Sequence, residues 1–203
     1  MSIRTERLIL RRWTPSDRTP FAAMNADPQV MRYFRAPLDR AASDGFVDRI
    51  EAGFDQHGYG LWALELVANA EFIGFTGLAR HTFPAHFTPA VEVGWRLSPP
   101  AWGHGFATEA ARAALRHGFD SAGLAEIVSM TARANQPSQA VMRRLGMTRD
   151  PADDFAHPSL PAEHPLAPHV LYRLSQDRYR SNRAEAGSDA DAEAGLVPER
   201  LRS

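Results

Sequence analysis

The sequence predicts a mixed α/β fold of the α+β type, in which an antiparallel front half of a sheet is followed by a strand-helix-strand unit. Three observations favour this fold. The chain has 203 residues, a length that suits one domain. Short aliphatic runs with strand periodicity alternate with stretches of helical periodicity. Two of these runs are separated by only a short polar segment, which predicts an antiparallel hairpin.

The N-terminal half is expected to supply the first strand, the first helices and the hairpin. Residues 6–13 alternate and are rich in aliphatic side chains, which is typical of a strand. Residues 15–24 and 39–56 carry apolar side chains at helical spacing. The two hairpin strands are expected at 61–67 and 72–78.

The C-terminal half is expected to alternate strands and helices. Small apolar residues fall on one face of the stretch from Ala107 to Phe119, so this helix can pack closely on a sheet. Asn135 is a good N-cap for a later helix. The other expected elements are a Pro-, His- and Phe-rich loop at 81–89 and strands at 91–97, 127–131 and 170–174.

The domain organisation follows from a change in composition near residue 180, after which apolar residues become few. Residues 1–180 are expected to form one domain. Residues 181–203 contain mostly Ala, Glu, Asp and Arg, and this composition predicts a disordered tail.

Composition excludes several classes of function. The formal net charge is −1, so nothing in the overall charge favours nucleic acid or an anionic membrane as a partner. The chain has no cysteine and no lysine, which excludes disulfides, a cysteine nucleophile, a Schiff base and a P-loop lysine. Charged residues interrupt the N-terminal apolar run, so we expect no signal peptide, no membrane span and a cytoplasmic location.

One glycine-containing turn stands between an expected strand and an expected helix. Gly103 and Gly105 permit backbone conformations that a Cβ would block and let a ligand approach the main chain. The free amides and the dipole of a helix N-terminus form a binding site for phosphate or pyrophosphate. The turn consists of Trp102, Gly103, His104, Gly105, Phe106, Ala107 and Thr108.

Two other interpretations of this turn remain open from the residues alone. It is either a plain connection between a strand and a helix or part of a dinucleotide-binding motif. The second is disfavoured because Thr108 stands where a third glycine is needed and because the turn does not open a βαβ unit.

Three motifs follow one another in order: VEVGWRL at 91–97, WGHGFATEA at 102–110 and NQPSQAVMRRLGM at 135–147. Together they resemble the GNAT acetyltransferase superfamily, most closely the branch that includes the ribosomal-protein alanine and serine N-terminal acetyltransferases. The segment TERLILR at 5–11 resembles the start of that branch, and the resemblance covers roughly residues 3–175. In the pyrophosphate motif of the superfamily Gly105 and Ala107 fit, while Trp102 occupies a position that is usually Gln or Arg.

This resemblance implies a mostly antiparallel sheet of about six to seven strands flanked by about four helices. It implies acetyl-CoA as co-substrate, with its pyrophosphate on the turn from Trp102 to Thr108. The pantetheine arm is expected between strands 91–97 and 127–131, against the main chain of Val93, Gly94 and Trp95. Asn135 is expected to contact this arm, and Ser138 to protonate the departing thiolate.

The attacking amine must lose a proton, and several side chains are candidates for the base. Glu92 is the leading candidate, because it lies beside the expected thioester carbonyl. His81 and His86 in the preceding loop are further candidates, each with an ordinary surface histidine as the alternative. Direct attack is expected, since no cysteine can carry the acyl group.

The residues that would bind the amine acceptor are harder to predict from sequence. The loop 153–169 is expected to border it and to offer acidic groups to a cationic amine, with Trp13, Met31 and Phe34 on the other wall. Its Asp, Glu and His residues match no compact metal motif, so no metal is expected. Three functions stay open: acetylation of a protein or peptide N-terminal amine, acetylation of a small-molecule amine, or non-catalytic acyl-CoA sensing. The chain is expected to be a monomer or homodimer.

Overall fold

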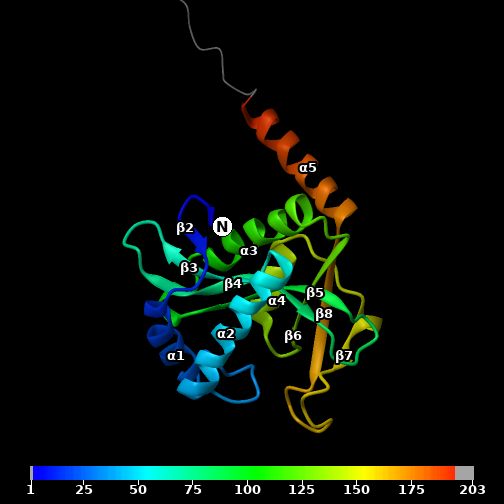
Figure 1. The fold of residues 1–203 in the computed structure, drawn as a ribbon. Coiled ribbons are helices and arrows are strands. Elements are labelled where there is room, and N and C mark those ends of the chain that lie inside the picture. Colours follow the sequence, from blue (N-terminus) through cyan, green and yellow to red (C-terminus); the bar gives the residue numbers. More distant parts are fainter. Residues whose placement is uncertain (1, 195–203) are drawn as a thin grey trace, which may run out of the picture.

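The fold is an α/β/α arrangement around one mixed sheet (Figure 1). The computed structural model describes residues 2–194, with side chains as far as residue 185. The strands are β1 (Ile3–Arg4), β2 (Leu8–Arg11), β3 (Leu61–Leu66), β4 (Phe72–His81), β5 (Ala90–Leu97), β6 (Glu126–Ala132), β7 (Phe155–Ala156) and β8 (Pro168–Ser175). The α-helices are α1 (Arg18–Ala26), α2 (Arg40–His57), α3 (Phe106–Arg116), α4 (Gln136–Arg144) and α5 (Gln176–Ala194), and short 3-10 or π turns cover Pro15–Asp17, Pro99–Ala101, His117–Ser121 and Pro151–Asp153.

The sheet has the order β1-β2-β3-β4-β5-β6-β8-β7, and every neighbouring pair is antiparallel except β5 and β6. The predicted class is therefore confirmed. The described residues contain eight strands rather than six to seven, because β1 and β7 are two-residue pairings. Such short strands carry no periodicity that a sequence pattern could reveal.

The two faces of the sheet are covered by different helices. On one face, the ring of Phe75 in β4 packs 5.9 Å from the rings of both Phe21 in α1 and Phe46 in α2. On the other face lies the segment after α3, where Gly118 fits so closely against Leu78 and Ile127 that a Cβ would stand within about 3 Å of both. Residues of β5 therefore face α1 and α2 or face α3 according to their alternation.

The expected tail boundary at 180 differs from the structure. Helix α5 continues from the end of β8 to Ala194 and projects from the body of the molecule (Figure 1). Its first turns are anchored, because the Tyr179 ring stacks 4.6 Å from Phe119 and Arg183 pairs with Asp120 at 2.9 Å. The disorder expected from residue 181 is thus replaced by helix as far as 194, and the remainder of that expectation, 195–203, lies outside the described residues.

Candidate active site

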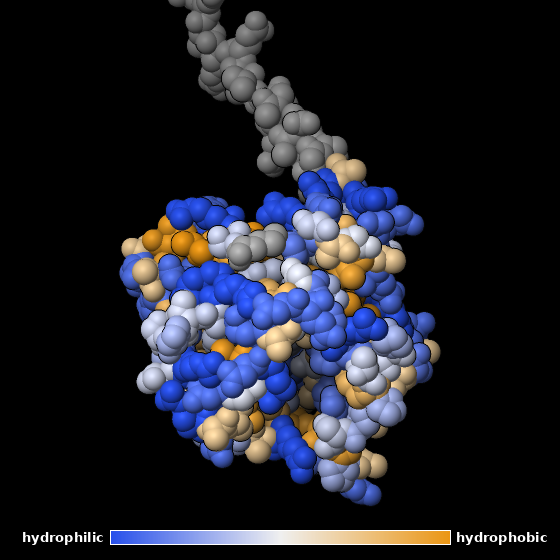
Figure 2. Space-filling model, in the orientation of Figure 1, coloured by the Kyte–Doolittle hydropathy of each residue, from blue (hydrophilic) through white to orange (hydrophobic). Residues whose placement is uncertain are grey.

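A large cavity opens where β5 and β6 diverge, with a volume of about 2040 Å³. Figure 2 shows this side of the surface hollowed near its middle, with hydrophilic residues around the hollow. Among Glu92, Ser138 and the residues expected to bind acetyl-CoA, Val93 alone does not line the cavity. Those that line it are Glu92, Gly94, Trp95, Trp102, Gly103, His104, Gly105, Phe106, Ala107, Thr108, Asn135 and Ser138.

The opening exists because β5 and β6 pair at a single position, Glu92 with Val128. Beyond this position, side chains form hydrogen bonds to the main chain of the neighbouring strand. Glu92 Oε1 accepts a hydrogen bond from the Met130 amide at 3.2 Å, and the Ser129 hydroxyl donates to the Val93 carbonyl at 2.9 Å. Val93 itself is fully buried in the core, so only its main chain is available to a ligand. An added Cβ at Gly94 would meet no atom within 4 Å, which shows that the cavity begins at this backbone.

The glycine turn has the conformation that its sequence predicts. Gly103 and Gly105 have φ of +79° and +80°, a region that side chains with a Cβ rarely adopt. Gly105 is the N-cap of α3 and no side chain caps the helix, so the first amides of α3 remain as donors. Nothing lies within 4 Å of a Cβ placed on Gly103. The turn is therefore an open cradle of main-chain donors at a positive helix end.

An arginine from the N-terminal turn fixes this cradle, and sequence analysis missed it. Arg7 Nη1 donates to the His104 carbonyl at 3.0 Å, and its guanidinium lies 4.7 Å from the centre of the Phe106 ring. Because carbonyl and following amide point in opposite directions across a trans peptide, this bond also orients the Gly105 N–H. Glu109 holds Arg7 in place through Nε at 2.7 Å and the main-chain amide at 2.9 Å.

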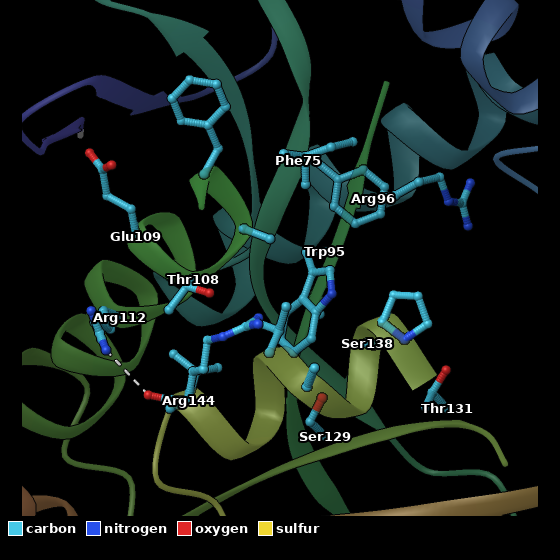
Figure 3. Close-up of a pocket in the computed structure, with 18 of the residues that line it drawn as sticks. Phe75, Trp95, Arg96, Thr108, Glu109, Arg112, Ser129, Thr131, Ser138 and Arg144 are labelled. Carbon is cyan, nitrogen blue, oxygen red and sulfur yellow. Dashed lines mark hydrogen bonds between the residues drawn. The ribbon is translucent and has the colours of Figure 1, made fainter. Parts of the chain in front are cut away.

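Beside the cradle, arginines of α3 and α4 line the same end of the cavity. They are Arg112, Arg116, Arg143 and Arg144. Arg112 donates to the Arg144 carbonyl at 3.2 Å, the contact drawn in Figure 3. The common position of these arginines gives this end of the cavity a positive charge suited to phosphate groups.

Glu92 and His81 form the pair of titratable groups nearest the opening. Glu92 Oε2 lies 2.7 Å from His81 Nε2. Burial lowers the pKa of His81, but the hydrogen bond and charge of Glu92 outweigh it, so this pKa is raised above its ordinary 6.5. The Glu92 side chain is only 16% exposed, which keeps its carboxylate within the cavity wall. His81 is therefore part of the site rather than a surface histidine.

The loop after α4 contributes histidines rather than carboxylates to the cavity. His157 and His169 line it with their rings 4.9 Å apart, and burial lowers the pKa of both below 6.5. The expected acidic groups are engaged elsewhere: Asp153 pairs with Arg173 at 2.6 Å, and Asp154 pairs with Arg149. None of the acidic side chains of 153–169 lines the cavity, so the expectation that this loop offers carboxylates to an amine is wrong.

Several other expectations about the walls need correction. His86 is turned to Asp153 at 3.2 Å and does not line the cavity. Trp13 and Met31 are core residues, 8% and 3% exposed. Phe34 does line the cavity, together with Phe46 of α2. Within the described residues, no group of three or more His, Cys, Asp or Glu side chains is placed to hold a metal ion.

Asn135 and Ser138 lie together at the start of α4. Asn135 Oδ1 accepts the Ser138 amide at 3.2 Å, so the predicted N-cap is present, and Asn135 Nδ2 donates to the Thr131 hydroxyl at 2.9 Å. The Ser138 hydroxyl makes no hydrogen bond to the side chains described up to residue 185 or to the main chain of 2–194, and it faces the cavity. Tyr172 of β8 is a core residue, 5% exposed, and its hydroxyl oxygen accepts a hydrogen bond from Arg143 Nη1 at 3.3 Å.

Arg96 is the most unusual side chain of the cavity, and sequence analysis gave it no role. Burial lowers its pKa to about 10. Nη1 donates to Asn25 Oδ1 at 2.6 Å, while Nε is buried without a partner in the described part of the chain. Its guanidinium lies 4.1 Å from the centre of the Phe34 ring and 5.5 Å from that of Phe75. No carboxylate of the described residues pairs with it. The strand pattern predicts only that Arg96 lies on the same face of its strand as Glu92 and Gly94.

Comparisons with known proteins agree with this geometry. The model of the acetyltransferase (GNAT) domain matches residues 7–148. The FsC-acetyl coenzyme A-N(2)-transacetylase of Aspergillus fumigatus is 40% identical over 132 residues, which cover 62% of this chain and 55% of that enzyme. The chain thus spans about half the length of that relative.

Solved structures give the same result for the fold. The acetyltransferase of Agrobacterium tumefaciens str. C58 aligns with a TM-score of 0.71 at 29% identity, covering 86% of this chain and 94% of that one. The ribosomal L7/L12 alpha-N-protein acetyltransferase RimL, solved with coenzyme A, aligns with a TM-score of 0.70 at 16% identity over 86% and 98%. The family model covers Arg7, the glycine turn and the whole of α4, and we conclude that the chain belongs to the GNAT acetyltransferase family.

Proposed function

We propose that this protein transfers an acetyl group from acetyl-CoA to a primary amine by direct attack. The observation that carries the proposal is the Glu92–His81 pair, 2.7 Å apart, in the same cavity as the open glycine cradle. One end of the cavity therefore suits the donor's phosphates and the other holds a proton acceptor. The relatives and the family model support acetyl transfer as the type of reaction.

The residues present fit acetyl-CoA along the cavity. The cradle from Trp102 to Thr108 would bind the pyrophosphate through main-chain amides, with Arg112 and Arg144 beside it. The exposed backbone of Gly94 and Trp95 would pair with the pantetheine arm, because β6 has moved away from it. Asn135 would contact that arm while also capping α4.

The acceptor attacks as the neutral amine, because an ammonium group has no lone pair, and its nitrogen must lose a proton as the amide forms. Glu92 is the group in position to accept this proton, and its second oxygen is held by the Met130 amide. His81 orients the carboxylate through its ring nitrogen. As the new C–N bond forms and the C–S bond breaks, the thiolate takes a proton, which the unengaged Ser138 hydroxyl would supply while it regains one from solvent water. Main-chain amides near Gly94 would stabilise the oxyanion.

A direct assay tests this proposal. Purified protein is mixed with acetyl-CoA and a panel of peptides, amino acids, polyamines and aminoglycosides, and thiol release and product mass are followed. The Glu92→Gln variant is expected to lose about 100-fold in kcat without a loss of acetyl-CoA affinity. Glu71→Gln, on the exposed β3–β4 turn, is the matched control and should retain full activity.

Each other outcome has a defined meaning. Tight binding of acetyl-CoA with no transfer to any amine would favour a non-catalytic sensor. Failure to bind acetyl-CoA would overturn the assignment of the cavity. A Glu92→Gln variant with unchanged kcat would remove Glu92 as the base. Transfer to peptides or to small amines alone would decide between those two acceptor classes.

A further inference from the structure

Arg96 lies in the half of the cavity away from the coenzyme cradle. It belongs to the same face of β5 as Gly94 and Glu92, and its strand partner is Phe75. In Figure 3 its guanidinium points away from Thr108 and Arg144, the residues of α3 and α4. A phosphate of the coenzyme held on the glycine cradle would therefore be at the opposite end.

The surroundings of Arg96 lack a negative charge. Its wall consists of the segment from Gln29 to Phe34, Phe46 of α2 and Phe75. The only other charged group of that wall is Arg32, stacked 4.6 Å from the Tyr33 ring.

The described carboxylates that line the cavity apart from Glu92 belong to other elements. Glu6 is in the N-terminal turn, Glu109 is bound to Arg7, and Glu185 is on α5. A guanidinium caged by aromatic rings is thus left with a neutral amide, Asn25, as its hydrogen-bond acceptor.

Such an arrangement is costly unless an anion completes it. Removing a cation from water without a counter-ion is unfavourable, and buried charges in proteins are normally paired. The Nη2 group makes no hydrogen bond within the described residues, and Nη1 donates only to Asn25, so donors of the guanidinium fork remain free. A planar fork of this kind matches the two oxygens of a carboxylate.

We propose that Arg96 binds a carboxylate of the acceptor, so that the preferred acceptors are amines that also carry a carboxylate group. This inference rests on the proposed acetyl transfer and specifies its acceptor. Arg96 is four positions along the strand from Glu92, about 13 Å between backbones. The spacing favours an acceptor whose carboxylate is several bonds from the reacting amine, such as a longer amino acid or a short peptide, over glycine and over a polycationic amine.

The decisive experiment compares acceptors that differ in charge alone. The kcat/KM of the wild-type enzyme is measured for ω-amino acids from glycine to 6-aminohexanoate and for the corresponding carboxamides. We expect the longer carboxylates to exceed their carboxamides by about 10- to 100-fold, mostly through KM. Equal use of both, or preference for spermidine, would overturn the proposal without affecting acetyl transfer itself.

Variants assign this preference to Arg96. Arg96→Gln should abolish the difference between carboxylate and carboxamide, and Arg96→Lys should restore part of it, since the charge returns without the fork. Arg35→Gln is the control, an exposed arginine of the same segment that does not line the cavity. If Arg96→Gln slowed carboxylate and carboxamide acceptors equally, Arg96 would have a structural role only.

A binding measurement separates this inference from the proposed function. Calorimetry of 6-aminohexanoate and of its carboxamide is performed on the full chain saturated with coenzyme A. Carboxylate-selective binding that disappears in Arg96→Gln supports the inference even if no transfer occurs, in which case the proposed reaction alone fails. Absence of selectivity in both calorimetry and kinetics overturns it.

Discussion

At the scale of single residues, Glu92 and His81 determine each other's behaviour in the cavity wall. Their 2.7 Å contact is between diagonal neighbours on β5 and β4, which the antiparallel register brings together. The pKa of His81 is raised by this contact in spite of its burial. A raised pKa means that the pairing stabilises the folded chain at low pH, and that this stabilisation is lost as pH rises through the pKa of His81.

The substitution Glu92→Gln is therefore expected to lower the pKa of His81 towards or below 6.5, because burial then acts alone. NMR titration of the imidazole gives this value directly. The stability difference between wild type and Glu92→Gln, from urea unfolding, should be larger at about pH 6 than at about pH 9. An unchanged His81 pKa would contradict the pairing.

At the scale of elements, the glycine cradle depends on a contact between the N-terminal turn and the first turn of α3. Glu109 accepts from the Thr5 hydroxyl at 2.6 Å and from Arg7 at two positions. Burial raises the pKa of Glu109, but these hydrogen bonds and the Arg7 charge lower it overall, below 4.5. The stabilisation is therefore present above pH 4.5 and is lost as pH falls through the lowered pKa.

Glu109→Gln is expected to lower the free energy of unfolding by about 1 kcal/mol at pH 7, a modest value because Arg7 is partly exposed. The difference from wild type should shrink as the pH is lowered below 4.5. Urea unfolding at both pH values measures it. A difference that stays constant with pH would show that the loss does not come from the ionised carboxylate.

The same element makes a second prediction, for Gly105→Val. A β-branched residue at φ of +80° strains the turn and places a side chain where the main chain must approach pyrophosphate. We expect coenzyme A affinity to fall at least about tenfold, which calorimetry would measure.

Gly123→Val is the matched control for that prediction. Gly123 has φ of +66° with no neighbour within 4 Å of an added Cβ, and it does not line the cavity. It should lose similar stability but retain coenzyme affinity. If both variants bound coenzyme A equally well, the turn would not be the pyrophosphate site.

At the scale of the whole molecule, one sheet joins two helical layers, and the cavity opens where the sheet is weakest. Helix α5 closes the C-terminal side: Tyr179 is 9% exposed, and its ring stacks on Phe119 after α3. No helix of residues 2–194 is both long and apolar enough to cross a membrane.

Tyr179→Ala is accordingly expected to lower the free energy of unfolding by about 2–3 kcal/mol, since it removes a buried ring from the core. Arg180→Ala, at an exposed neighbouring position, should change it by less than about 0.5 kcal/mol. Thermal or urea unfolding of the two variants provides the comparison. Equal effects would mean that α5 is not docked.

The class of fold, the order of the main elements and the glycine turn can be predicted from the sequence alone, because they depend on local properties. Periodicity, capping by Asn135 and the two glycines act within a few residues of chain. The family motifs added Glu92 and Ser138 as candidates.

The contacts between distant segments, in contrast, follow only from the three-dimensional fold. Arg7 meets His104 and Glu109, His81 meets Glu92, and Arg96 meets Asn25 and Phe34 because strand register and helix packing bring them together. The loop 153–169 differs from its expected role for the same reason, since Asp153 and Asp154 pair with arginines of other segments. The sequence shows which charged and hydrogen-bonding groups are present. Their pKa values and hydrogen bonds depend on neighbours that only the folded chain brings close.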